Sequence, residues 1–167
     1  MADSFLNIKL SRSRGNRILK INNDKAIILD PRRLPDKKIL KKQVKEIAEL
    51  IRYQIFRNIL EGKRYDGKNV AGLALSTIRK KGSSRPLVDT GKMAYSVVVA
   101  EEGGKTVVRM SRNRYPKKGK GSAPTVEEVA GYLQTGNSKM PARPFFGITK
   151  KDLNNFVKIV IKDRLFK

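Results

Sequence analysis

The sequence predicts an α+β fold in which an antiparallel sheet with a β-hairpin accompanies one long amphipathic helix and a C-terminal helix. Three observations indicate this class: apolar runs of period two near the N-terminus, apolar residues spaced by three and four in the first half, and two β-branched runs joined by a turn that ends in Gly-Gly. Extended loops are expected between these elements. A length of 167 residues suits a single domain over residues 1–167.

The N-terminal segment, residues 1–34, predicts two or three antiparallel strands. Leu6, Ile8 and Leu10 alternate with polar residues, and two further apolar runs follow them. Turn-forming Gly, Asn and Asp residues separate the runs, as is typical of hairpin connections.

Apolar residues recur at spacings of three and four from Ile39 to Ile59, which predicts a long amphipathic helix of about 25 residues. Asp36 is placed to cap this helix, and Gly62 is placed to end it. Its first turns carry several lysines on the opposite face, where the helix macrodipole disfavours positive charge. This end either docks on something negative or is simply a solvated face. The lysines are Lys37, Lys38, Lys41, Lys42 and Lys45.

The apolar periodicity lapses over residues 62–92, where turn signals surround a short helical candidate at 76–80. We expect an extended loop here that becomes ordered against a neighbouring molecule. The β-branched runs 95–100 and 105–110 then predict a β-hairpin.

A second extended loop is expected over residues 111–124. From Arg112 to Gly121 it contains Gly, Pro and basic residues without a single acid, so we expect it to be mobile in the free protein.

Two capping signals predict the remaining helices. Thr125 and Glu128 form a capping box that opens a short helix ending near Gly136. Thr149 and Asp152 predict the start of the C-terminal helix in the same way. Its apolar stripe is expected to be Leu153, Phe156, Val157, Val160 and Ile161.

The composition excludes several classes of chemistry. The chain has no His and no Cys, so the usual zinc, haem and iron–sulfur ligand sets cannot be built, and neither a Cys nucleophile nor a His general base is present. Most hydrolase chemistry is excluded with them, and we expect no cofactor and no metal centre. The 38 Lys and Arg residues against 15 Asp and Glu give a net charge of +23, which predicts an acidic partner, nucleic acid or a packed assembly.

Residues 1–10 lack the apolar run of a signal peptide, and no stretch approaches the ~18 apolar residues of a membrane span. The absence of Cys also favours the cytosol or a particle assembled there. We therefore expect a soluble protein without a membrane partner.

Two possible sites fail on spacing. Residues 89–92, Asp-Thr-Gly-Lys, resemble the end of a phosphate-binding loop, but the required earlier glycine falls at Pro86 and the following Ser or Thr falls at Met93. Carboxylates could hold Mg²⁺ in a nuclease-like site, yet no spacing supports it, and caps and turns explain most of them. These carboxylates are Asp66, Asp89, Glu101, Glu102, Glu127 and Glu128.

The segment from Arg109 to Lys120, here called the basic loop, has Tyr115 inside it and is the strongest nucleic-acid candidate, because its cations neutralise phosphates and a tyrosine can stack on a base. An acidic protein surface would select the same residues, and both interpretations stay open. The candidates that would face DNA or a partner are Arg109, Arg112, Arg114, Lys117, Lys118, Lys120 and Arg143. The aromatic residues are interpreted instead as core or subunit-interface packing. They are Tyr132, Phe145, Phe146, Phe156 and Phe166, together with Leu133.

Two blocks of sequence, taken together, carry a family resemblance. The first runs through Tyr65-Asp66-Gly67 to Asp89-Thr90-Gly91-Lys92-Met93, and the second joins Gln134-Thr135-Gly136 to Pro141-Ala142-Arg143-Pro144-Phe145-Phe146-Gly147. From about Tyr65 onward the chain resembles the phage virion-morphogenesis, or tail-completion, family of Mu-like phages and related neck and head-tail joining proteins. The family pattern usually has a His beside the Gln-x-Gly, where this sequence has Leu133.

The resemblance implies a non-enzymatic virion protein that forms a ring at the neck or tail end and joins the tail to the head, after assembly in the host cytoplasm. Its implied partners are further copies of itself, the tail tube and the head-tail connector. Their acidic faces, or DNA passing through the channel, would meet the positive charge. Arg143 would offer an ion pair to an acidic neighbour from a rigid turn, or the turn would simply lead into the last helix. The alternatives are a basic nucleic-acid-binding protein and, third, a metal-dependent nuclease.

Overall fold

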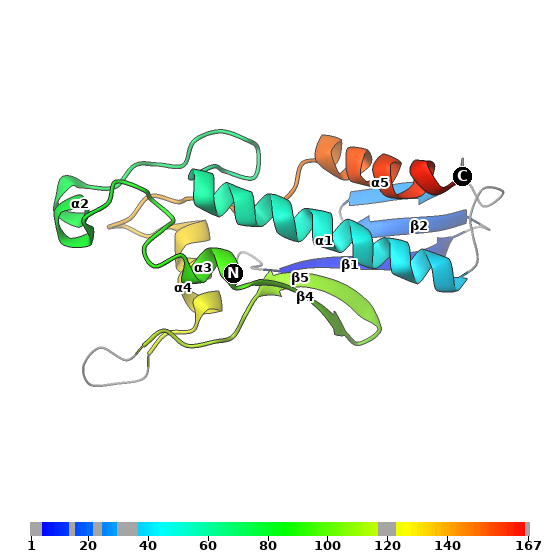
Figure 1. The fold of residues 1–167 in the computed structure, drawn as a ribbon, viewed down its shortest axis with the longest axis horizontal. Coiled ribbons are helices and arrows are strands. Elements are labelled where there is room, and N and C mark those ends of the chain that lie inside the picture. Colours follow the sequence, from blue (N-terminus) through cyan, green and yellow to red (C-terminus); the bar gives the residue numbers. More distant parts are fainter. Residues whose placement is uncertain (1–4, 14–15, 22–24, 30–36, 117–122, 166–167) are drawn as a thin grey trace. The chain divides into compact units, whose positions relative to one another are not determined.

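The computed structural model describes five ranges of the chain, which form five strands and five helices (Figure 1). The described residues are 5–13, 16–21, 25–29, 37–116 and 123–165. They belong to two compact units. Of the described residues, the first unit comprises 5, 54–98, 109–116 and 123–147, and the second comprises 6–13, 16–21, 25–29, 37–53, 99–108 and 148–165. The expectation of a single domain stays a prediction.

The second unit contains most of a five-stranded sheet with strand order β3-β2-β1-β5-β4. Strands β1 (Phe5–Ser13), β2 (Asn16–Ile21) and β3 (Lys25–Leu29) pair antiparallel, with Leu10 opposite Leu19 and Ile18 opposite Ile28. The predicted N-terminal strands are therefore confirmed, and the α+β class with them.

The predicted hairpin is formed by β4 (Val97–Glu102) and β5 (Lys105–Met110). Gly103 and Gly104 connect them with φ values of 56° and 71°, the left-handed backbone that a tight two-residue hairpin turn requires. The prediction began the first strand too early, because Tyr95 belongs to the short helix α3 (Lys92–Tyr95) and Ser96 is its C-cap.

Helix α1 (Lys37–Glu61) confirms the predicted long helix. Ile47, Ile51, Ile55 and Ile59 are spaced by four and almost completely buried, so the apolar stripe faces the core along the helix. The expected end is also found, since Gly62 follows with a φ of 64°. The expected cap, Asp36, lies outside the described residues.

In the lysine-rich start of α1, the structure describes the side chains from Lys41 onward. Lys41, Lys42 and Lys45 are exposed, and the Nζ atom of Lys41 lies 3.0 Å from a carboxylate oxygen of Glu101. The side chains of Lys37 and Lys38 lie outside the described part. At least one of these lysines therefore has its acidic partner within the chain.

Helix α5 (Lys150–Leu165) begins as predicted, because the Thr149 hydroxyl accepts a hydrogen bond from the Asp152 amide at 3.1 Å. Leu153, Val157 and Val160 of its predicted stripe are buried, and Phe156 is half-buried. The side chain of Ile161 lies outside the described part.

The first unit contains α2 (Leu75–Lys81), α3 and α4 (Val126–Thr135). Helix α2 is the short helix predicted within residues 62–92. Helix α4 has the predicted capping box: the Thr125 hydroxyl accepts from the Glu128 amide at 3.1 Å, and the Glu128 carboxylate accepts from the Thr125 amide at 2.7 Å. Among the described helices, none has the length and apolarity to cross a bilayer.

Candidate functional site

Residues 134–147, here called the strap, begin with the last two residues of α4 and lead to the segment before α5. Residues 136–147 form no helix and no strand. The side-chain amide of Gln134 binds the backbone of Phe146 at both ends. Its Nε2 donates to the Phe146 carbonyl at 2.9 Å, and its Oε1 accepts from the Phe146 amide at 3.1 Å. One glutamine thus replaces the strand partner that this piece of backbone lacks.

The residues after Arg143 are held by two further elements of the same unit. Asn58, on the last turns of α1, donates to the Phe145 carbonyl at 3.3 Å, and the Tyr65 amide donates to the Pro144 carbonyl at 3.0 Å. The Phe145 and Phe146 rings are buried and meet edge to face, with centroids 6.3 Å apart. Both are core residues, as predicted.

Two glycines allow the strap to approach its neighbours closely. A Cβ atom on Gly136 would lie 2.5 Å from the Ala142 nitrogen, and its φ of 68° is itself unfavourable for other residues. A Cβ atom on Gly147 would lie 2.9 Å from Cγ of Tyr65. Both positions therefore require glycine for steric reasons.

Arg143 contradicts the expectation that it faces DNA or an acidic neighbour. It is only 3% exposed, and its guanidinium donates to the carbonyls of Ala71 and Gly72 at 2.8 Å each. Burial lowers the pKa of its guanidinium, but an arginine stays charged at any physiological pH. The turn that contains Arg143 therefore positions its guanidinium for a contact within the first unit.

These contacts bring together residues from both blocks of the resemblance. Tyr65 comes from the first block, whereas Gln134, Gly136, Arg143 and Gly147 come from the second. Each of them acts on backbone atoms or makes room for a neighbour. The residue types that define the pattern are therefore the ones that shape this part of the fold.

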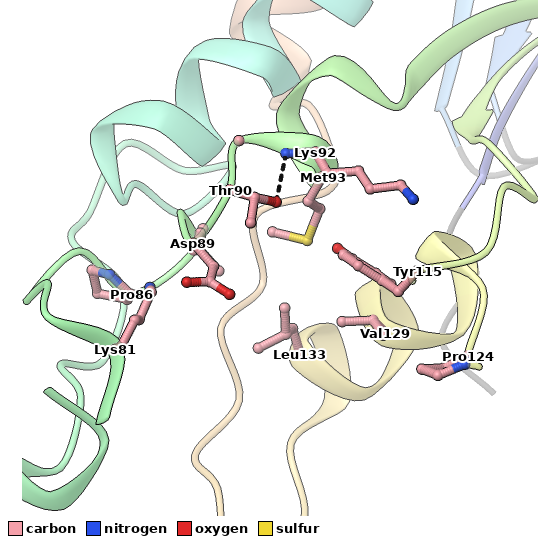
Figure 2. A pocket seen from close by; sticks show the side chains of 12 residues that line it. Lys81, Pro86, Asp89, Thr90, Lys92, Met93, Tyr115, Pro124, Val129 and Leu133 are labelled. Carbon is pink, nitrogen blue, oxygen red and sulfur yellow. Dashed lines mark hydrogen bonds between the residues drawn. The ribbon is translucent and has the colours of Figure 1, made fainter. Parts of the chain in front are cut away.

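The first unit also contains a cavity of about 280 Å³ beside the strap (Figure 2). Leu133, Val129 and Met93 supply apolar surface, and Asp89 and the Tyr115 hydroxyl point into the space between them. The full lining is Lys81, Pro86, Leu87, Asp89, Thr90, Gly91, Lys92, Met93, Tyr115, Pro124, Val129 and Leu133.

The polar groups of the cavity influence one another. Burial raises the pKa of the Tyr115 hydroxyl, and the nearby Asp89 carboxylate raises it further. Burial lowers the pKa of Lys81, although Asp89 partly opposes that shift. The Nζ atom of Lys92 lies 5.1 Å from the centroid of the Tyr115 ring and donates to the Arg114 carbonyl.

The described lining suits binding better than catalysis. At neutral pH Tyr115 keeps its proton, and the ammonium groups of Lys81 and Lys92 are already bound to the carbonyls of Arg85 and Arg114. An apolar floor with a carboxylate and a phenol above it fits a small amphipathic group. The sequence does not locate this cavity, because its lining comes from separate stretches of the chain at residues 81, 86–93, 115 and 124–133.

The basic loop is anchored at its base, where Arg114 pairs with Thr125 in a β-bridge. Arg112 is exposed and lies 3.2 Å from Glu127, and Arg114 is exposed and donates to the Ala123 carbonyl at 2.8 Å. Arg109, on β5, is half-buried and donates to the Met110 carbonyl. The remaining candidates are Lys117, Lys118 and Lys120, which lie outside the described residues. The mobility expected of this loop therefore stays a prediction.

The carboxylates singled out from the sequence have separate roles. Asp66 accepts from the Lys68 amide and lies 3.2 Å from Arg64, Glu101 pairs with Lys41, and Glu128 caps α4. Among the residues that the structure describes, no three His, Cys, Asp or Glu side chains come together in a way that could hold a metal ion.

Tyr132 differs from the other aromatic residues near the strap. It is 62% exposed, so its interpretation as core packing is wrong, and packing at a subunit interface stays a prediction for it. Leu133, its neighbour, lines the cavity. Phe166 lies outside the described residues.

Comparisons with known proteins add no further constraint to this geometry. No protein-family model, curated protein or solved structure matches the chain.

Proposed function

We propose that the protein is a structural virion protein of a tailed phage, a tail-completion or neck subunit that forms a ring and joins the tail to the head. One observation carries this proposal: the residues of the two resembling blocks meet in the strap and hold its backbone. These residues have a structural reason to occur together, so their combination says more about the fold than unrelated identical residues would. The resemblance to the proposed family rests on this combination.

The charge distribution also supports a subunit that works in an assembly. The net charge of +23 makes an isolated chain self-repelling, and most of the described lysines and arginines lie at the surface. Acidic faces of adjoining rings would reduce that repulsion. DNA in the channel of the assembly would do the same.

The first test is the mass of the purified protein in solution, measured by light scattering or mass photometry at low and high salt. A ring held by apolar contacts keeps its mass as salt rises, because salt screens charges and does not weaken apolar burial. A monomer at every salt concentration and protein concentration contradicts the proposal.

The second candidate is a basic nucleic-acid-binding protein, favoured by the exposed Arg112 and Arg114 at the base of the basic loop. Binding through several phosphates falls steeply between low and moderate salt. Replacing both arginines by Gln would weaken binding to short duplex DNA and reduce its salt dependence under this candidate. A double variant at the exposed Lys68 and Lys139 is the matched control, with the same loss of charge elsewhere. A virion ring instead keeps its mass in both variants.

A further inference from the structure

Helix α2 lacks the burial that normally stabilises so short a helix. None of its seven residues is buried, and Leu75 is 73% exposed. Its N-cap is Ala74, which offers no side-chain hydrogen bond. A seven-residue helix is marginal in water by itself, so α2 is a segment whose stability calls for a further contact.

The surface of α2 is apolar and basic. Leu75 and Ile78 lie three residues apart and therefore share one face of the helix. The last turn consists of Arg79, Lys80 and Lys81, and the first turn has no acid. Lys81 already donates to the Arg85 carbonyl, which leaves Arg79 and Lys80 as exposed cations. A partner for this helix needs an apolar groove and carboxylates at its rim.

The second unit has a groove of this kind between α1 and α5, with a volume of about 590 Å³. Leu50, Val160 and the 51% exposed Ile159 supply its apolar surface. Its polar rim is formed by Lys42, Lys45, Glu46 and Glu49 of α1. The Glu49 carboxylate accepts from Arg52 at 2.6 Å, and a carboxylate has room for additional donors.

The dimensions and charges of the helix and the groove match. Seven helical residues span about 10 Å, as does the rise along α1 from Lys42 to Glu49. With its basic last turn beside Glu46 and Glu49, α2 places its uncharged first residues beside Lys42 and Lys45. The reverse orientation would bring Arg79 and Lys80 against those lysines, so the charges select one direction.

We propose that α2 of one subunit docks into the α1–α5 groove of a second copy of the chain. This inference rests on the proposed ring-forming function and names the contact that would build the ring. The two surfaces are different, so the contact is heterologous, and a repeated heterologous contact closes into a ring when its rotation allows.

Disulfide cross-linking tests the contact directly, because the chain has no Cys of its own. The variants are Leu75→Cys on the helix and Ile159→Cys in the groove, both exposed positions whose replacement leaves the core intact. Under mild oxidation the double variant is expected to form a ladder of covalent multimers. A mixture of the two single variants is expected to stop at dimers, since each chain then carries one cysteine.

A double variant of Leu75→Cys with Ser138→Cys is the matched control, because Ser138 is exposed and outside the groove. A yield no higher than this control overturns the inference. A disulfide within one chain, seen as an oxidised monomer by mass spectrometry, also overturns it, as does a dimer formed by Leu75→Cys alone. If the protein forms rings in solution but the double variant does not cross-link above the control, only the docking contact is wrong. If no oligomer forms at any salt concentration, the proposed function is wrong as well.

Charge reversal tests the chosen orientation. Glu49→Lys is expected to reduce the cross-linking yield about tenfold, because it places like charges opposite each other in the contact, and adding Arg79→Glu is expected to restore the yield. A yield that is unchanged by Glu49→Lys contradicts the role of charge in the contact.

Discussion

The strap and the segment that carries α2 differ sharply, although both are Gly-containing connections of the first unit. Residues 71–85, here called the arm, have no buried side chain among them, whereas the strap buries Arg143, Phe145 and Phe146. Gln134 and Asn58 bind the backbone of the strap, whereas Arg143 binds the arm only at Ala71 and Gly72. Beyond these two residues the arm has the bonds of its own short helix and turns. The difference shows that polar side chains that satisfy a connection's backbone along its length help to make it part of the core, whereas bonds at one end leave the rest of the arm without buried side chains.

The largest effect is expected from Gly136→Ala in the strap. The added Cβ atom would lie 2.5 Å from the Ala142 nitrogen, and φ is 68°, so we expect the free energy of unfolding to fall by about 3 kcal/mol or more. Urea unfolding followed by circular dichroism measures the change.

Gly131→Ala is the matched control, because a Cβ atom there meets nothing within 4 Å and the residue lies inside α4. This variant should gain up to about 1 kcal/mol from the better helix propensity of alanine. Similar stability of the two variants would show that the strap is not packed as described.

The next effect concerns the glutamine that binds the strap. Gln134→Met removes both hydrogen bonds to Phe146 and leaves its amide and carbonyl unpaired, so we expect a loss of about 2 kcal/mol. Gln134→Glu keeps the acceptor for the Phe146 amide but loses the donor, and should fall between wild type and Met. Thermal unfolding of the three proteins ranks them, and any other order contradicts the pairing.

A smaller effect distinguishes the capped α4 from the uncapped α2. Thr125→Ala removes the hydroxyl that accepts from the Glu128 amide and is expected to cost about 1 kcal/mol of stability. Hydrogen bonds from the Thr125 amide and hydroxyl lower the pKa of Glu128 in the folded state. The contribution of this cap is therefore present above the ordinary pKa of 4.5 and is lost as pH falls through the lower, folded pKa.

Unfolding measured between pH 7 and pH 3 checks the sign of this dependence. The wild type should lose more stability than Glu128→Gln over this range, because the variant has no carboxylate to protonate at this cap. Equal losses would mean that Glu128 makes no pH-dependent contribution through the cap.

The smallest effect is expected in the arm. Leu75→Ser should change the free energy of unfolding by less than about 0.5 kcal/mol, because Leu75 is 73% exposed. Urea unfolding at low protein concentration, where subunits are apart, makes the measurement. A loss above 1.5 kcal/mol would show that the arm is packed within the monomer, and the contrast with the strap would disappear.

The sequence predicted the regular elements because their signals are local. The spacing of Ile47, Ile51, Ile55 and Ile59 defines α1, and the capping box of Thr125 and Glu128 defines the start of α4. Such patterns depend on residues a few positions apart, so they survive without knowledge of the fold.

The roles of the strap residues could not be predicted in the same way. Arg143 looked like a surface cation because it lies between prolines in a basic chain, yet its partners are the carbonyls of residues 71 positions or more away. Gln134 and Gly136 were visible only as part of a pattern. Carbonyl and amide groups have no side-chain identity, so the sequence does not show which of them a polar side chain will bind.

The two hydrogen bonds from Arg143 end at Ala71 and Gly72, and the arm beyond them has no buried side chain, so we expect it to open locally while the strap stays packed. We expect amide hydrogens of α2, such as that of Gly82 bound to the Ile78 carbonyl, to exchange with water through such local openings. Those of Arg143 and Phe146 are expected to exchange more slowly, when the first unit unfolds. Any partner that captures α2 must offset the entropy of ordering it, about 1–2 kcal/mol for each residue that is not already helical.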